Sequence, residues 1–565
     1  MTNTLFYGDN LDVMRKHLAD ASVDLVYLDP PFNSNRDYNV LFKEQSGAES
    51  PAQIKAFGDT WKWANAALDW ENFPELCPSP RVQDLMEGFV KMLGRNDVSA
   101  YLVMMAPRLY HLHRVLKPTG SLYLHCDPTA AAYLKILLDA IFGAKNFRNE
   151  ITWKRADAHN DAKNQYPAIS DRLLFYVKSP AAVFHRQHGG FQEQTLRDWY
   201  QYVEMPDATT RRMTKEEQQT QTVPDGARRF NTADMTSPNP RPNLMYDYKG
   251  YPYPTKGWRY SRDTMEALDA EGLLLFPEKS NGRIMRKRYL DEQPGAVIGD
   301  IWTDVSQLRA VNVEKLGYPT QKPVALLERI ITASSNPGDV VFDPFCGCGT
   351  AIVAAQTLGR KWVGIDVTPI ATSLIVDRLA KMHCRDQRVV KAGDPDYARA
   401  FQVEGLPTDL PGAQKLFQDN PKDFEMWAVS LIPVTPQDKK GADGGIDGIK
   451  DYFVGEKKPI RAVVQVKGGH VGMPQVQQLR GAMEKFGATL GLFLSLEAPT
   501  SKMKEEASHA GFYTLPLTGK PIQRLQLRTV GDLLDGSNFD LPSYAAPTQA
   551  VTDAPATIRQ TGMDL

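Results

Sequence analysis

Hydrophobic and polar positions in the first 180 residues alternate between the spacing of a buried strand and that of a helix. Residues 23–28 form a short apolar run that stops at two prolines, which indicates a strand ending at residue 28. Helical spacing over residues 101–112 leads to a second strand at 121–125, and a helix follows over 133–141. Because strands that alternate with helices are joined by crossovers, this pattern predicts a parallel sheet in an α/β fold.

The alternation is interrupted between residues 181 and 304, where Pro, Gly, Tyr and Arg are frequent and no period is sustained. It returns as a helix at 323–331, a strand at 340–343, a helix at 351–358 and a strand at 362–366. We therefore predict a Rossmann-like domain in two halves, residues 1–180 and 305–395, with an inserted lobe at 181–304. A linker at 396–420, a smaller α/β unit at 421–535 and a disordered tail at 536–565 complete the predicted organisation.

Composition narrows the class of protein without deciding its chemistry. The length of 565 residues exceeds what one hydrophobic core organises, and 42% hydrophobic with 24% charged residues is typical of a soluble globular protein. No apolar run is long enough for a membrane span, and five cysteines do not make a disulfide framework, which favours the cytoplasm. With a net charge of -1, a nucleic-acid partner would have to meet Lys and Arg gathered on one face.

The strand at 340–343 runs into a glycine-rich turn and then a helix, the junction at which doubly wound sheets bind ligands. Asp366 ends the next strand, where its carboxylate can accept hydrogen bonds from both ribose hydroxyls of a nucleoside. The turn lacks the G-x-G-x-x-G spacing, which disfavours a dinucleotide. A turn that merely joins two elements is the alternative for this segment alone. The candidate ligand-binding residues are Asp343, Phe345, Gly347, Gly349, Thr350 and Asp366.

A second candidate site, Asp29-Pro30-Pro31-Phe32, ends a strand of the same predicted sheet. The Asp29 carboxylate and the Pro30 carbonyl can accept hydrogen bonds from an exocyclic amine, which would localise the lone pair on its nitrogen. Pro31 has no N–H to compete, and Phe32 can stack on a base flipped out of a duplex. The alternative is a turn that only ends the strand. Since no Pro-Cys pair occurs, direct methylation of an amine is preferred to a cysteine-dependent mechanism at carbon.

These motifs together resemble the amino-methyltransferases of restriction-modification systems, in the subgroup whose catalytic motif precedes the donor motif. The resemblance spans about residues 1–180 and 305–395. It depends on Gly8-Asp9, Asp29-Pro30-Pro31-Phe32-Asn33, His125-Cys126-Asp127-Pro128, Phe147-Arg148-Asn149-Glu150-Ile151-Thr152-Trp153, Pro319-Thr320-Gln321-Lys322-Pro323, Asp343-Pro344-Phe345-Cys346-Gly347-Cys348-Gly349-Thr350 and Gly364-Ile365-Asp366.

The resemblance implies S-adenosylmethionine as methyl donor and double-stranded DNA as substrate, with RNA as an open alternative. It assigns Asp29 and Phe32 to the catalytic motif. It assigns Lys322, Phe345, Gly347, Gly349 and Asp366 to the donor pocket. An aspartate at the head of the catalytic motif favours N6 of adenine over N4 of cytosine. Tyr318 is a departure, because many relatives have histidine there. A homodimer is an open alternative to a monomer.

In this family the target-recognition region occupies the place of residues 181–304. Lys256-Gly257-Trp258-Arg259-Tyr260 and the cluster Arg283, Arg286, Lys287 and Arg288 interleave cations with aromatic residues, as contacts to phosphates and bases require. An ordinary solvated face is the alternative for the arginine cluster.

The C-terminal unit carries a second set of candidate residues. Asp447 lies in a glycine-rich turn, and Gln465 and Lys467 point to one side of a strand at 463–467. Asp447 and the Val466 carbonyl can hold Mg²⁺, while Lys467 orients the attacking water. The unit resembles Mrr-like restriction endonucleases of the PD-(D/E)xK fold, in which glutamine replaces the second acid. Glu425 matches the acidic helix position of that family and is a second candidate metal ligand.

The combined prediction is modification and restriction in one polypeptide, with one recognition lobe serving both activities. Two alternatives stay open for the C-terminal unit: an inactive nuclease fold that only binds DNA, or a strand whose lysine simply faces water. In the first case the chain would be an orphan methyltransferase.

Overall fold

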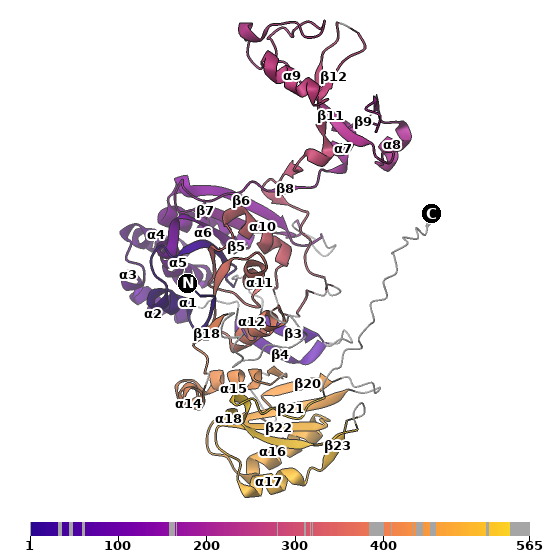
Figure 1. Cartoon of the computed structure of the whole chain (residues 1–565). Coiled ribbons are helices and arrows are strands. Elements are labelled where there is room, and N and C mark those ends of the chain that lie inside the picture. The colour runs from indigo at the N-terminus through magenta and orange to yellow at the C-terminus, as the bar shows by residue number, and fades with distance from the viewer. Residues whose placement is uncertain are drawn as a thin grey trace. The chain divides into compact units, whose positions relative to one another are not determined.

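The computed structural model describes residues 2–31, 37–43, 49–58, 63–157, 164, 166–279, 281–309, 312, 314–316, 318, 320–382, 401–407, 409–432, 434–436, 445–452, 459–515 and 519–542. Two compact units are present, residues 1–185 with 300–565 and residues 186–299 (Figure 1). The first unit contains two large sheets, and each is described by itself.

A nine-stranded sheet joins strands that are far apart in the sequence, in the order β15-β6-β7-β5-β2-β16-β17-β1-β18. The run from β5 to β18 is parallel. Strands from the first 180 residues meet strands from the second half of the predicted domain where β2 pairs with β16 and where β1 pairs with β17. The predicted α/β fold is therefore confirmed. The strands are β1 Thr4–Tyr7, β2 Val23–Leu28, β5 Leu116–Cys126, β6 Phe147–Lys154, β7 Ser170–Val177, β15 Ile301–Trp302, β16 Val340–Asp343, β17 Lys361–Asp366 and β18 Gln402–Glu404.

Two features of this sheet differ from the sequence prediction. β7 is antiparallel to both β5 and β6, and the described residues between β6 and β7 contain no crossover helix. β18, which pairs with β1, falls in the segment that we expected to be a linker. By contrast, β2 and β16 have the predicted bounds and are buried at every position, as expected for parallel strands covered on both faces.

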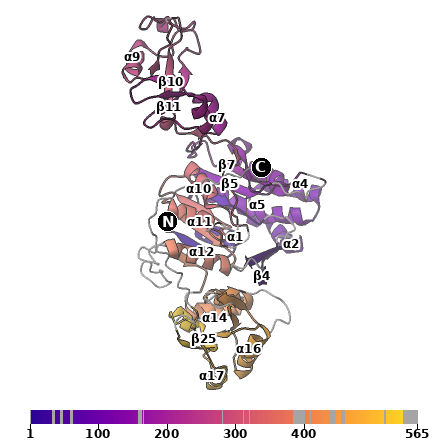
Figure 2. The same cartoon turned by 90° about the vertical axis from the view of Figure 1, so that its right-hand side faces the viewer.

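Helices cover the two faces of the sheet in two groups (Figure 2). α4, α5 and α6 pack together in one group, and α10, α11 and α12 in the other. A two-stranded hairpin, β3 Asp37–Lys43 with β4 Glu49–Gly58, follows the Asp29 motif in the sequence. The helices are α1 Asn10–His17, α2 Trp63–Glu71, α3 Phe73–Leu76, α4 Pro80–Leu93, α5 Asp97–Val115, α6 Pro128–Phe142, α10 Val324–Ser334, α11 Thr350–Thr357 and α12 Pro369–Met382.

The second unit, residues 186–299, has a five-stranded antiparallel sheet in the order β10-β9-β11-β13-β12 and a small core of its own. Its strands are short, which explains why no period was visible in the sequence. The elements are β8 His188–Gly189, α7 Glu193–Trp199, β9 Tyr202–Glu204, β10 Thr210–Arg212, α8 Lys215–Thr220, β11 Arg228–Asp234, α9 Arg262–Ala270, β12 Leu274–Leu275, β13 Met285–Tyr289 and β14 Ala296–Val297.

The C-terminal part has a mixed five-stranded sheet in the order β19-β20-β21-β22-β25, with a hydrophobic cluster on each face. Its strands are β19 Thr435–Pro436, β20 Gly448–Tyr452, β21 Ile460–Lys467, β22 Leu490–Ser495 and β25 Leu525–Thr529, beside a hairpin of β23 Phe512–Thr514 and β24 Pro521–Gln523. Its helices are α14 Leu410–Asp419, α15 Pro421–Ser430, α16 Met473–Lys485, α17 Ser501–Ser508 and α18 Val530–Leu534.

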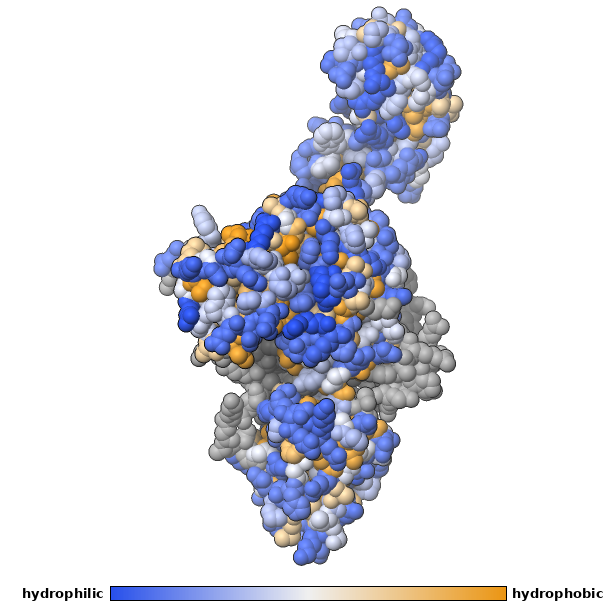
Figure 3. All heavy atoms as spheres, turned by 90° about the vertical axis from the view of Figure 1, so that its left-hand side faces the viewer, coloured by the Kyte–Doolittle hydropathy of each residue, from blue (hydrophilic) through white to orange (hydrophobic). Residues whose placement is uncertain are grey.

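In the part of the chain that the structure describes, no helix has the length and apolar character needed to cross a bilayer. The face drawn in Figure 3 is covered largely by hydrophilic residues, with hydrophobic ones scattered among them.

A buried histidine on α5 predicts sensitivity to acid. His111 accepts a hydrogen bond at Nδ1 from Arg114 Nε at 3.2 Å, and burial, followed by the charges of Arg114 and Arg15, lowers its pKa from 6.5 to about 4. Between these values the unfolded chain binds more protons, so the folded protein loses stability as pH falls from 6.5 towards 4. Thermal unfolding midpoints from about pH 7 to about pH 5 should therefore fall less in His111→Gln than in the wild type. Parallel slopes would contradict this prediction.

Candidate active site and candidate nuclease site

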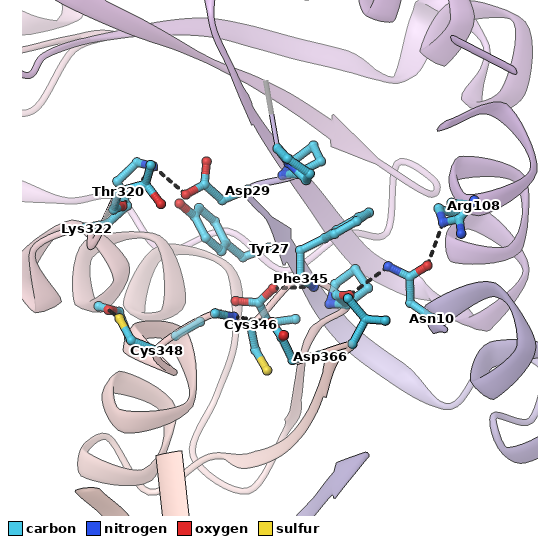
Figure 4. A pocket seen from close by; sticks show the side chains of 18 of the residues that line it. Asn10, Tyr27, Asp29, Arg108, Thr320, Lys322, Phe345, Cys346, Cys348 and Asp366 are labelled. Atoms are coloured by element: carbon cyan, nitrogen blue, oxygen red, sulfur yellow. Dashed lines mark hydrogen bonds and ion pairs between the residues drawn. The ribbon is translucent and has the colours of Figure 1, made fainter. Parts of the chain in front are cut away.

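A cavity of about 390 Å³ lies at the carboxyl ends of β2, β16 and β17, in the middle of the nine-stranded sheet. It is lined by Asp29 from the end of β2, by the turn that follows β16, and by Asp366 from the end of β17. Figure 4 shows these side chains converging from both halves of the chain. The cavity is also lined by Gly8, Asp9, Asn10, Tyr27, Pro30, Pro31, Asp69, Arg108, Tyr318, Lys322, Asp343, Phe345, Gly347 and Thr350, among others.

Asp29 forms an ion pair with Lys322 across this cavity (Figure 4). Both side chains are largely buried, with 16% of Asp29 and 10% of Lys322 exposed. In this arrangement one carboxylate oxygen of Asp29 already accepts a hydrogen bond from the Lys322 ammonium group. A ligand amine that hydrogen-bonds to Asp29 must therefore share the carboxylate with Lys322 or displace it.

Asp366 holds the glycine-rich turn and still faces the cavity. Its Oδ2 accepts a hydrogen bond from Gly347 N at 2.8 Å, and its Oδ1 accepts from Thr368 N and Thr368 Oγ1 at 2.9 and 2.7 Å. Burial raises the pKa of Asp366, although these three hydrogen bonds oppose the shift. A carboxylate has about four acceptor sites, and three are in use, so Oδ2 can accept one further hydrogen bond from a ligand hydroxyl.

The cavity is rich in carboxyl groups, which suits a ligand that carries positive charge. Asp9, Asp29, Asp69, Asp343 and Asp366 line it, against the cations of Arg108 and Lys322. Burial raises the pKa of Asp343 well above its usual value, and the charges of Asp29 and Asp366 add to the effect. A cationic ligand would relieve this crowding of negative charge.

A hydrogen-bonded network that we did not predict supports the turn after β16. Asn10 Nδ2 donates to the Pro344 carbonyl at 2.8 Å, and Arg108 Nε donates to Asn10 Oδ1 at 2.6 Å. Arg108 also pairs with Asp9 at 2.6 Å, and Asp9 in turn caps α1 by accepting from Leu11 N at 2.9 Å. The only sequence signal was a lone arginine within an otherwise apolar stretch of helix.

Gly349 ends this turn in the left-handed region, with a φ of +76°, and a Cβ there would lie 2.6 Å from Ile375 Cγ1. Gly359 has a similar φ of +69°, but a Cβ there meets nothing within 4 Å. Gly359→Ala should cost only the backbone strain, about 1 kcal/mol. Gly349→Ala should cost about 1 to 3 kcal/mol more, because the buried Ile375 must move. Comparing the thermal unfolding of the two variants tests this, and equal losses would show that the overlap with Ile375 is harmless.

Of the predicted residues, Asp29, Pro30, Pro31, Lys322, Asp343, Phe345, Gly347, Thr350 and Asp366 line one cavity, and Gly349 lies in the turn that borders it. Phe32 lies outside the described residues, so its predicted stacking role stays a prediction. Tyr318, the departure from the family pattern, packs over the turn, since a Cβ on Gly347 would lie 3.3 Å from Tyr318 Cε1.

The C-terminal candidate site gathers at one end of β21. Asp447 Oδ2 accepts a hydrogen bond from Val466 N at 2.7 Å, and Asp447 N donates to the Val464 carbonyl at 2.8 Å. Burial, with a contribution from the charge of Glu425, raises the pKa of Asp447 to about 6, although the Val466 N–H and the charge of Lys467 oppose the shift. The three predicted charged residues therefore interact electrostatically, and Asp447 is largely ionised at neutral pH.

Gln465, the fourth predicted residue, is fully buried on β21. Its Nε2 donates to Gln478 Oε1 at 3.4 Å, whereas its Oε1 has no hydrogen-bond partner among the described residues. A buried carbonyl oxygen without a hydrogen-bond partner lowers the stability of the folded state unless a ligand binds to it. Mg²⁺ prefers oxygen ligands of this kind. Within the described ranges, no three His, Cys, Asp or Glu side chains form a group that could hold a metal. Gln465 and a backbone carbonyl would thus have to complete any Mg²⁺ site.

In the second unit the structure corrects part of the proposed DNA-contacting surface. Trp258 is buried in the core of the unit and donates from Nε1 to the Tyr246 carbonyl at 2.7 Å, so it cannot stack on a base. Lys287 is buried beside Glu204, with which it forms an ion pair. The reason is strand alternation, which turns Lys287 inward on β13 and leaves Arg288 exposed.

Comparison with known proteins agrees with this geometry. Residues 23–376 match the family model described as DNA methylase, which is more than half of the chain. The chain belongs to the DNA methylase family. Residues 421–520 match a second model, described as restriction endonuclease. The predicted resemblance to amino-methyltransferases and to Mrr-like endonucleases is thereby confirmed.

Individual relatives of this DNA methylase align with only part of its chain. The type II methyltransferase M.EcaI of Enterobacter cloacae is 32% identical over 284 residues, covering 50% of this chain and 58% of the relative. The DNA adenine methyltransferase YhdJ of Escherichia coli strain K12 is 51% identical over 364 residues, covering 64% of this chain and 78% of the relative. The solved structure of the M1.HpyAVI-SAM complex is 14% identical to this chain. The match covers 66% of this chain and 98% of the M1.HpyAVI chain, with a TM-score of 0.29. The chain thus spans little more than half of M.EcaI.

Proposed function

We propose that this DNA methylase transfers a methyl group from S-adenosylmethionine to an exocyclic amine of a DNA base, N6 of adenine in preference to N4 of cytosine. One observation carries the proposal: Asp29, at the end of β2, lines the same cavity as Asp366 and the Gly347 turn. These two strand ends come from opposite halves of the chain. Their meeting provides one place for an amine acceptor and a nucleoside acceptor together.

The residues of the cavity fit S-adenosylmethionine. Asp366 Oδ2 retains one acceptor site for a ribose hydroxyl, and the surrounding carboxylates favour a sulfonium cation. Phe345 and the backbone of Gly347 border the space where an adenosine would lie. When bound, S-adenosylmethionine would supply the methyl carbon: the C–S bond breaks with its electron pair left on sulfur, a C–N bond forms, and the proton released by the nitrogen passes to water.

The residues proposed to act directly on the target amine are Asp29 and Pro30, in the loop that follows β2. The Asp29 carboxylate and the Pro30 carbonyl accept the two N–H groups of the amine, which localises the nitrogen lone pair towards the methyl group. Lys322 gives up its ion pair with Asp29 when the amine arrives. A base in a duplex is out of reach of this buried site, so the target must be flipped out.

Methyl transfer is tested directly with purified protein, duplex DNA and S-adenosylmethionine tritiated in the methyl group. The proposal expects label in DNA and not in RNA of the same sequence. Digestion of the product to nucleosides should give N6-methyl-2′-deoxyadenosine, while N4-methyl-2′-deoxycytidine would keep the mechanism and change the base. No label in any DNA of mixed sequence would refute the proposed activity.

The C-terminal domain is proposed to be a Mg²⁺-dependent endonuclease, so that modification and restriction occur in one polypeptide. Asp447 with the Val466 carbonyl, the orphaned Gln465 Oε1 and Glu425 would hold the ion. Lys467 would orient water and offset phosphate charge. Cleavage of unmethylated DNA, with protection of the same DNA after methylation, is the expected result. DNA binding without cleavage at any Mg²⁺ concentration would instead favour a methylase whose C-terminal domain only binds DNA.

A further inference from the structure

A chain of buried hydrogen bonds leads from the cavity into the sheet. Tyr27, His125 and Asp171 lie on the adjacent strands β2, β5 and β7. The Tyr27 hydroxyl lies 3.0 Å from His125 Nδ1, and His125 Nε2 lies 3.1 Å from Asp171 Oδ2. None of the three side chains is more than a few per cent exposed: Tyr27 2%, His125 0% and Asp171 3%. The proposed function gives no role to these three hydrogen-bonded side chains.

The chemistry of the three groups fixes the direction of the bonds. Burial opposes ionisation of Asp171, but the hydrogen bond from His125 and the nearby Lys322 and Arg155 hold its pKa below the usual value. As a carboxylate, Asp171 can only accept, so His125 must carry a proton on Nε2. An imidazole with its one proton on Nε2 accepts at Nδ1, and in that tautomer the Tyr27 hydroxyl donates to His125.

The other side of the Tyr27 hydroxyl faces the candidate active site. Tyr27 lines the cavity, and Figure 4 shows its side chain beside Asp29. Burial, and then the negative charges of Asp29 and Asp343, raise the pKa of Tyr27 well above its ordinary value, so the hydroxyl stays neutral. With its proton committed to His125, the Tyr27 oxygen acts towards the cavity only as an acceptor.

We propose that Tyr27 is a further catalytic residue, whose hydroxyl oxygen contacts the electron-poor methyl group of the donor, and that His125 and Asp171 are the positioning residues that keep its proton away. The amine already has acceptors in Asp29 and the Pro30 carbonyl, which leaves the sulfonium methyl as the partner for Tyr27. This inference rests on the proposed methyl transfer. A C–H···O contact of this kind is weak in water and gains strength in a buried site.

The test compares the Kd values of two ligands, measured for each variant by calorimetric titration. S-adenosylmethionine has the methyl group and the sulfonium charge, whereas S-adenosylhomocysteine lacks both. Tyr27→Phe should raise the Kd of S-adenosylmethionine by about fivefold and leave that of S-adenosylhomocysteine unchanged. Loss of structure would weaken both ligands together, so unchanged binding of S-adenosylhomocysteine also reports that the variant is folded.

Tyr123→Phe is the matched control. Tyr123 pairs with Tyr27 in register on β5, is equally buried, and has its hydroxyl 2.8 Å from Ser334 Oγ instead of near the cavity. It should change neither the two Kd values nor their ratio. A ratio in Tyr27→Phe equal to that in Tyr123→Phe would overturn the proposal.

His125→Leu tests the positioning role, because it releases the Tyr27 proton. It should reproduce the selective loss of S-adenosylmethionine affinity, and the double variant with Tyr27→Phe should lose no more than Tyr27→Phe alone. Additive losses would overturn the role of His125. If His125→Leu does not bind S-adenosylhomocysteine, that variant is misfolded, and the proposal is judged from the Kd values of Tyr27→Phe. If the wild type binds neither ligand, the proposed function fails and not merely the role of Tyr27.

Discussion

Asp29→Ala is expected to lower the rate of methyl transfer to DNA by about 100-fold or more, the usual effect of removing one group that stabilises developing charge. In the proposed mechanism the carboxylate is the charged acceptor for the target amine, and its removal also leaves the Lys322 ammonium without its ion-pair partner. Developing positive charge on nitrogen would then face a cation instead of an anion. Single-turnover transfer of a tritiated methyl group at saturating donor measures the effect on the chemical step.

Asp127→Ala is the control, because Asp127 ends the neighbouring strand β5 and also precedes a proline. It caps α6 by accepting from Ala130 N at 3.1 Å and is not among the residues that line the cavity. Its loss should cost about 1 kcal/mol of stability and leave the transfer rate unchanged. If the two variants transferred methyl groups at similar rates, Asp29 would not be the acceptor.

Features of the fold that depend on local pattern could be predicted from the sequence. β2 and β16 were predicted with their observed bounds, because a strand covered on both faces is a continuous apolar run that ends at a turn. The antiparallel β7 was not predicted, since strand direction depends on the connection and not on the strand. The sheet of the second unit was missed for another reason, as strands of two to seven residues show almost no period.

The candidate site also contains residues that could be predicted from local pattern and residues that could not. Asp29, Asp366 and the Gly347 turn were predicted because each follows a recognisable strand, and parallel strands end at one edge of a sheet. The link from Arg108 through Asn10 to the Pro344 carbonyl joins residues 98 and 334 positions apart. Such a network has no local signature. Trp258 shows the opposite error, because an aromatic residue between cations looks the same in sequence whether it faces solvent or the core.

His125 shows how a correct general expectation can miss a particular role. It forms no metal spacing with the other histidines, so the sequence by itself indicates only a structural residue. The structure places it between Tyr27 and Asp171, which come from strands on either side of it. Only the order of strands in the sheet, which the sequence does not state, brings these three residues together.

Asp447→Ala and Lys467→Ala are each expected to lower DNA cleavage by about 100-fold or more while DNA binding persists. Asp447 is the largely buried carboxylate that the Val466 N–H orients, so its loss removes the charged ligand on which Mg²⁺ would depend. Lys467 lies at the same end of β21 as Gln465, and its proposed role is to offset the charge that develops on phosphate. The measurement is single-turnover cleavage of unmethylated DNA over a Mg²⁺ titration, beside a binding assay in Ca²⁺.

The two variants should respond differently to Mg²⁺. Raising its concentration should partly restore Asp447→Ala, because a weakened site fills by mass action, and should not restore Lys467→Ala, whose metal ligands are intact. Lys502→Ala, an exposed lysine on α17, is the control for a general loss of positive charge and should cleave at the wild-type rate. Methyl transfer by the same preparations shows whether the rest of the chain is folded. Cleavage that persists in both active-site variants would place the scissile chemistry elsewhere, and the end of β21 would then be a DNA-binding surface only.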